Sequence, residues 1–206
     1  SSANYVVTDL NPQMLKRAAS MADDTSVIAW KTADAIDLPF NDGSFDLVLC
    51  QFGVMFFPDR VRAYQEARRV LRRGGAFIFS MWDRIEANDF AYEVTRALAD
   101  MFTDDPPTFL ARTPHGHHST ATYRIELAAA GFEHVTIEPL EVKSVALNPA
   151  IPAIAYCQGT PLRNEIEARN PRSLQEAAAR ATDAIRNRFG DSNLESRIRG
   201  FVITAC

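Results

Sequence analysis

Two short segments of this chain, residues 45–50 and 76–80, are almost entirely apolar. Near-continuous apolar strands are typical of parallel sheets that helices cover on both faces. Between the two segments, Pro58 begins a helical pattern studded with arginines, and Gly74-Gly75 follows as a helix end. This alternation of strand and helix predicts an α/β fold with a doubly wound, mostly parallel, Rossmann-like sheet.

The remaining patterns extend the alternation in both directions. Residues 5–9 and 26–30 read as strands, Asn11-Pro12 opens a helix, and residues 34–44 form a turn-rich loop. Further along, the sequence predicts a helix at 88–102 and a loop at 103–118. Ser119 or Thr120 then caps a helix that ends at Gly131, and a strand follows at 134–140. The last predicted elements are helices within 149–190, of which 173–189 is the clearest, and a strand at 198–205.

Charge and hydropathy narrow the classes of partner. The net charge of −4 repels nucleic-acid backbones. Six arginines within residues 60–73 alternate with apolar residues at helical spacing, so we interpret them as the solvated face of an amphipathic helix. The longest apolar run, residues 47–57, is well short of the ~20 residues that cross a bilayer, and the first residues show no targeting pattern. We therefore expect a cytoplasmic protein with neither nucleic-acid nor membrane partners.

Two carboxylates follow predicted strands. Asp9 closes the strand at 5–9, and Asp34 with Ala35 follows the strand at 26–30. Ligands of open parallel sheets bind at the carboxyl ends of the strands, where an acid can accept hydrogen bonds from ribose hydroxyls. An acid in this place can equally cap a helix, and that alternative stays open for each residue alone.

Aromatic and histidine side chains supply candidates for a second site. Met55, Phe56, Met81 and Trp82 come just past two strands, where an apolar substrate pocket would use them, although most large aromatics are simply core. His115 and His117 are weak candidates for a general base, since histidines in a loop more often cap a helix or face solvent. We expect no metal, because no Cys or carboxylate stands at ligand spacing from them.

Three stretches together resemble a known family. They are DAIDLPFNDGSFDLVL at 34–49, FFPD at 56–59 and RVLRRGGAFIFS at 69–80. This combination resembles the class I S-adenosylmethionine-dependent methyltransferases of the small-molecule type, which includes enzymes of ubiquinone and menaquinone biosynthesis. The resemblance is strong over about residues 5–82 and looser over 119–140.

The resemblance implies roles for particular residues. S-adenosylmethionine would be the cofactor, with Asp9 on its ribose, Leu10 on the adenine, and Asp34 with Ala35 on the adenine amino group. Gln51 and Phe52 would face the methionine part and the path of methyl transfer. The product would be a methylated small, partly apolar molecule, formed by an enzyme that needs no strong base when its acceptor is already nucleophilic.

One feature of the family is missing. Members begin with a strand and a glycine-rich turn about 20 residues before the ribose acid, whereas Asp9 has eight residues before it and no G-x-G precedes it. We therefore expect the natural protein to contain more residues before Ser1, with a strand that lies between those at 5–9 and 45–50.

The expected organisation is a single methyltransferase domain over residues 1–206. Residues 1–82 would form the cofactor-binding half, incomplete at its N-terminus. Residues 83–118 and 149–190 would form a helical substrate cover, and 119–148 with 191–206 the rest of the sheet.

Other functions are weighed against this one. A non-catalytic relative or fragment that uses the same fold for binding stays the main alternative, and a homodimer is left open. A nucleic-acid methyltransferase is disfavoured, because the Pro106-Pro107 pair is followed by Thr108 instead of tyrosine. A short-chain oxidoreductase is disfavoured because no tyrosine has a lysine four residues later.

Overall fold

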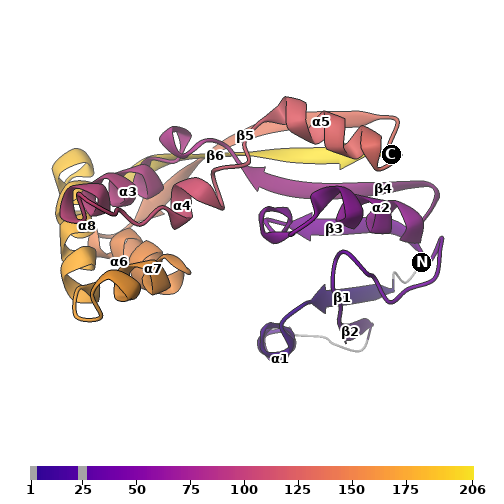
Figure 1. The fold of residues 1–206 in the computed structure, drawn as a ribbon, viewed down its shortest axis with the longest axis horizontal. Helices are drawn as coiled ribbons and strands as arrows, with labels where there is room; N and C mark the ends of the chain where they lie inside the picture. Colours follow the sequence, from indigo (N-terminus) through magenta and orange to yellow (C-terminus); the bar gives the residue numbers. More distant parts are fainter. Residues whose placement is uncertain (1–3, 23–26) are drawn as a thin grey trace.

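The computed structural model describes residues 4–22 and 27–206. Within these residues the strands form two sheets (Figure 1). The smaller sheet pairs β1 (Tyr5–Asp9) with β2 (Ile28–Thr32) in parallel. The larger sheet has the order β3-β4-β6-β5, built from β3 (Phe45–Gln51), β4 (Leu71–Trp82), β6 (Leu194–Ala205) and β5 (Val135–Ala146).

The α/β class is confirmed, but the larger sheet is mixed and not mostly parallel. β3 and β4 run parallel, whereas β6 runs antiparallel to both β4 and β5. The β5–β6 ladder extends from Val135↔Ala205 to Ala146↔Leu194. The intervening chain leaves the far end of β5 through three helices and re-enters β6 at that same end, so the two strands must be antiparallel.

β1 and β3 lie next to each other without forming a ladder in the described residues. Leu49 of β3 is 68% exposed and lines a cavity between these strands, so the expected burial of the strand on both faces is wrong. That a further strand lies between β1 and β3 stays a prediction.

Three helices pack beside the strands: α1 (Pro12–Ala19), α2 (Arg60–Val70) and α5 (Thr120–Ala129). Asn11 caps α1 and Ser119 caps α5, as the sequence predicted. An aromatic core joins α2, α5 and β4, because the Phe79 ring lies 5.5 Å from that of Tyr64 and 5.9 Å from that of Tyr123.

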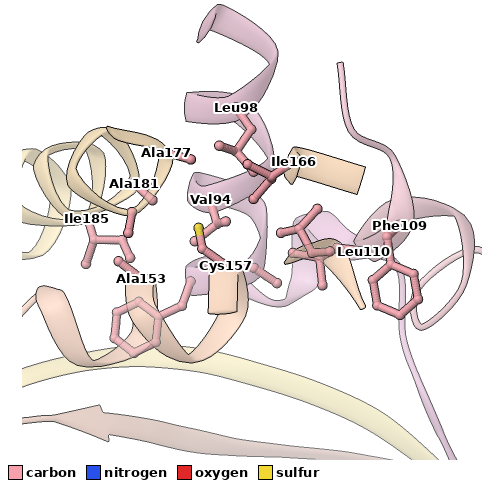
Figure 2. Close-up of a cluster of buried hydrophobic side chains, with 14 of the residues drawn as sticks. Val94, Leu98, Phe109, Leu110, Ala153, Cys157, Ile166, Ala177, Ala181 and Ile185 are labelled. Carbon is pink, nitrogen blue, oxygen red and sulfur yellow. The ribbon is translucent and has the colours of Figure 1, made fainter. Parts of the chain in front are cut away.

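A helical module lies beyond the ends of β5 and β6, on the left of Figure 1. It comprises α3 (Asp89–Met101), α4 (Phe109–Arg112), α6 (Ala150–Gly159), α7 (Leu162–Arg169) and α8 (Leu174–Phe189). Figure 2 shows its separate core, where Ala177, Ala181 and Ile185 of α8 face Val94 and Leu98 of α3. The predicted helix at 173–189 is therefore confirmed.

Polar contacts fix this module to the sheet. The Asp89 carboxylate on α3 accepts hydrogen bonds from the Arg197 backbone and from the Arg188 side chain, both at 2.9 Å. The side-chain oxygen of Asn88 accepts one from the Arg199 backbone at 3.0 Å. The bonds from the Arg197 and Arg199 backbones replace water around buried polar atoms and hold α3 against β6, whereas the Arg188 bond joins α8 to α3.

Several boundaries differ from the predictions. α2 ends at Val70 and β4 begins at Leu71, so Gly74-Gly75 lie inside the strand and not at a helix end. The pairing shifts from Phe45↔Leu71 to Leu47↔Ala76, and Gly74, with φ of 81°, lies in the resulting bulge. The predicted loop at 103–118 contains α4, and the predicted strand start at Ser26 lies outside the described residues.

Across the part of the chain that the structure describes, every helix is too short or too polar to cross a bilayer.

Candidate active site

A cavity of about 480 Å³ lies between β1 and β3. It extends from the middle of β3, beside Val48 and Leu49, where the further strand is predicted, to the carboxyl ends of the strands. Its lining includes Asp9, Leu10, Asp34, Ala35 and Gln51. Asp9 and Asp34 meet there because β1 and β2 are parallel in register, with Asp9 beside Thr32, and the Asp9 carbonyl accepts a hydrogen bond from the Ala33 N–H at 3.1 Å.

Each carboxylate uses one oxygen to shape its own turn. Asp9 Oδ1 accepts from the Asn11 N–H at 2.7 Å, and Asp34 Oδ1 accepts from the Ile36 N–H at 3.1 Å. The second oxygen of each has no hydrogen-bond partner among residues 4–22 and 27–206. Neither acid caps a helix, because Asn11 caps α1 and Asp34 lies in a loop that no helix follows. Each acid keeps a second oxygen as an acceptor for a ligand.

The loop that carries Asp34 and Ala35 is held by two residues whose role the sequence reasoning missed. Glu66 on α2 is 3% exposed and accepts a hydrogen bond from the Leu38 N–H at 2.8 Å. Arg69 donates to the carbonyls of Leu38 and Phe40 at 2.9 and 2.7 Å. Hydrogen bonds from Arg69 lower the pKa of Glu66, despite its burial.

These contacts correct the interpretation of the arginines as a solvated face. Arg69 binds the loop, and Arg60 forms an ion pair with Glu126 of α5 in which both side chains are less than one-fifth exposed. The signal in the sequence is Glu66, a lone acid among the arginines of this helix.

A second cavity, of about 340 Å³, lies between the sheet and the helical module. Phe52, Met55, Phe56 and Trp82 line one side of it. The opposite side comes from the module and the loop before α5, and includes Phe109, Leu110, His115, Tyr156 and Thr160. Phe56 also lines the first cavity, so the two cavities share a wall.

Two of the residues predicted for the cofactor site and the substrate pocket lie elsewhere in the structure. Phe52, expected near the cofactor, lines the second cavity and not the first. Met81 is fully buried in the aromatic core and lines neither cavity, because it points to the other face of β4 from Trp82.

The two candidate histidines lie in different surroundings. His115 lines the second cavity and is 5% exposed, and burial lowers its pKa from 6.5. His117 lines a small recess of about 70 Å³, with its Nδ1 3.1 Å from Arg60 Nη1. Burial, and then the charge of Arg60, lower the pKa of His117.

The first cavity suits a nucleoside. Two carboxylates offer acceptors for hydroxyl and amino hydrogens, and Leu10 and Ala33 offer apolar surface for a base. No group of three His, Cys, Asp or Glu side chains converges as metal ligands within the described ranges.

Comparisons with known proteins find methyltransferases. Residues 1–79 match the methyltransferase domain family. The ubiquinone/menaquinone biosynthesis C-methyltransferase of Rickettsia felis is 30% identical over 156 residues, which cover 70% of this chain and 63% of that protein. The mitochondrial 2-methoxy-6-polyprenyl-1,4-benzoquinol methylase of Mus musculus is also 30% identical, over 69% of this chain and 47% of the relative.

The chain thus spans less than two thirds of the length of these relatives. A solved structure of a protein from Bacillus halodurans has a TM-score of 0.57 and 18% identity, and the match covers 97% of this chain and 81% of that one. That similarity shows the fold. On the sequence matches, residues 1–79 correspond to a methyltransferase domain, and the chain is similar to methyltransferases over about 70% of its length.

Proposed function

We propose that this chain binds S-adenosylmethionine in the first cavity and methylates a small, partly apolar molecule in the second. The observation that carries the proposal is the wall that the two cavities share at Phe56. A cofactor in one cavity and an acceptor in the other would meet there. Holding two reactants in contact supplies a large part of the catalysis of such a transfer.

The cofactor residues follow from what each group offers. The free carboxylate oxygen of Asp9 would accept from a ribose hydroxyl, and Leu10 would pack on the adenine. Asp34 and the Ala35 backbone would bind the adenine edge, and Gln51, at the end of β3, would face the methionine part. When bound, the cofactor supplies an electrophilic methyl group.

The acceptor residues are those of the second cavity. Phe52, Met55, Phe56 and Trp82 would form its apolar wall and exclude water from the transfer. Met81 would support Trp82 from within the core without contacting the acceptor. The relatives named above methylate intermediates of quinone biosynthesis, and an apolar acceptor here is in keeping with their names.

Calorimetric titration with S-adenosylhomocysteine tests the cofactor half of the proposal. We expect binding by this chain or by a form extended at its N-terminus, and loss of affinity in Asp9→Asn. Binding by neither form would contradict the proposal. Binding without production of any methylated product from a panel of apolar acceptors would favour the alternative, a non-catalytic binding protein.

A further inference from the structure

The second cavity is largely apolar but contains two ionisable side chains, His115 and Tyr156. Burial raises the pKa of Tyr156, so its hydroxyl keeps its proton at neutral pH. His115 therefore has to be considered as the base of this cavity. Because His115 is only 5% exposed, it is not a loop histidine that faces solvent.

The backbone fixes the tautomer of His115. Its Nδ1 lies 2.7 Å from the carbonyl oxygen of Asp83, the residue after β4. A carbonyl oxygen can only accept, so Nδ1 carries the hydrogen, and in the neutral ring Nε2 carries the lone pair. Among the residues that the structure describes, Nε2 has no hydrogen-bond partner.

The surroundings keep this ring neutral. The charged and titratable groups that act on it are Asp83 and Glu86, which favour its charged form, and His118, which opposes it. Burial outweighs the two acids and lowers the pKa of His115. The Trp82 ring, whose centroid is 6.1 Å away, adds apolar surface on the cavity side. The lone pair of Nε2 is therefore available at neutral pH.

We propose that Nε2 of His115 accepts the hydrogen bond, and then the proton, of a weakly acidic hydroxyl on the acceptor. This inference rests on the proposed function. The acceptor's O–H bond breaks, its proton passes to Nε2, and its oxygen keeps the electron pair. With that pair the oxygen would form a bond to the methyl group that the cofactor supplies, while the bond from this methyl group to sulfur breaks and leaves its electrons on the sulfur of S-adenosylhomocysteine. The imidazolium then returns the proton to solvent. His115 would be a catalytic residue.

The strength of this base restricts the acceptor. General-base catalysis works best when base and acid are matched, and a histidine with a lowered pKa is a weak base. It suits a hydroxyl as acidic as a phenol, whose pKa is about 10 in tyrosine, and not an aliphatic alcohol. The cavity therefore favours an apolar molecule with a phenolic or enolic hydroxyl.

Two matched probes test this contact directly. 4-Methylphenol, whose hydroxyl keeps its proton at neutral pH, carries the donor, and 4-methylanisole carries a methyl ether in its place. By calorimetry near neutral pH, we expect the chain to prefer the phenol about five- to tenfold, as for one neutral hydrogen bond. The preference should vanish in His115→Phe, which keeps a ring without nitrogen, and persist in His134→Gln, which changes an exposed histidine.

A second readout needs no variant. Protonation of His115 removes the acceptor, so affinity for the phenol should fall as pH drops through the lowered pKa of His115, while affinity for the ether should not. Equal affinities for the two probes, or the same pH profile for both, would overturn the proposal. S-adenosylhomocysteine is titrated in parallel. Loss of its binding alone would refute the cofactor site and leave His115 in place, whereas its binding without discrimination between the probes would refute only His115.

Discussion

The rings of Phe52 and Trp82 stack with their centroids 3.9 Å apart and their planes 11° from parallel. Phe52 has a left-handed φ of 50°, which a phenylalanine adopts only at a cost. Its N–H donates to Ser80 Oγ at 3.0 Å. The stack and this hydrogen bond together hold the ends of β3 and β4 as one wall of the second cavity.

Removing the stacking partner should weaken this wall. Trp82→Ala should lower the free energy of unfolding by about 1 to 3 kcal/mol, from lost apolar burial and lost ring stacking. Trp82→Phe, which can still stack, should cost less than about 1.5 kcal/mol. Urea unfolding followed by circular dichroism measures both. Equal losses in the two variants would mean that a smaller ring at this position stabilises the fold no more than a methyl group does.

The acid at the end of β1 should determine cofactor affinity. Asp9→Asn keeps an oxygen for the Asn11 N–H but loses the charge, so binding of S-adenosylhomocysteine should weaken by about 1.5 to 3 kcal/mol. Asp100→Asn, an exposed change on α3, should leave affinity unaltered. Calorimetry gives both values. A folded Asp9→Asn variant with full affinity would refute the ribose assignment.

Glu66 should act on the cofactor site through the loop that it holds. In Glu66→Gln the charge-assisted bonds from Arg69 are lost, and stability should fall by about 1 to 3 kcal/mol at neutral pH. The folded pKa of Glu66 is lowered from 4.5, so its contribution is present above that value and disappears as pH falls through the folded pKa. The stabilities of the wild type and the variant should therefore become equal at acidic pH, which thermal unfolding over a range of pH values would show. A constant difference would assign the loss to packing.

The core of the helical module should tolerate truncation poorly. Leu98 is fully buried between α3 and its neighbours (Figure 2), so Leu98→Ala should cost about 2 to 5 kcal/mol. Leu140 on β5 is 54% exposed, and Leu140→Ala should cost less than about 0.5 kcal/mol. Chemical unfolding compares the two. Similar losses would mean that Leu140 is covered in solution.

Local signals predicted the elements well. The strand at residues 5–9, the Asn11 and Ser119 caps and the helix at 173–189 depend on neighbouring residues in the sequence, and each was confirmed. Strand direction depends on where the chain re-enters the sheet, which no local pattern contains. The antiparallel β6 was missed for that reason.

The same limit applies to the site. Motif resemblance selected Asp9 and Asp34, and the structure brings both to one cavity. It could not show that Arg69 reaches across to the loop, because the partners are carbonyls whose positions depend on the fold. Nor could it separate His115 from His117, which are two residues apart but lie in different cavities.

The titration of His115 should also be visible in stability. Its folded pKa is lowered from 6.5 by burial, against the opposing effect of Asp83 and Glu86 and with a small contribution from His118. The unfolded chain therefore takes up the proton first as pH falls, and stability should drop from about pH 6.5 down to the folded pKa. The pKa of His117 is lowered as well, so His115→Gln should remove only part of the loss of stability at low pH. Thermal unfolding at about pH 7.5 and about pH 5.5 measures this loss of stability, and His134→Gln, which changes an exposed histidine, is the control. A drop that is the same in wild type and His115→Gln would show that the ring is not buried as a neutral group, and Nε2 would then lose its role as the base of the second cavity.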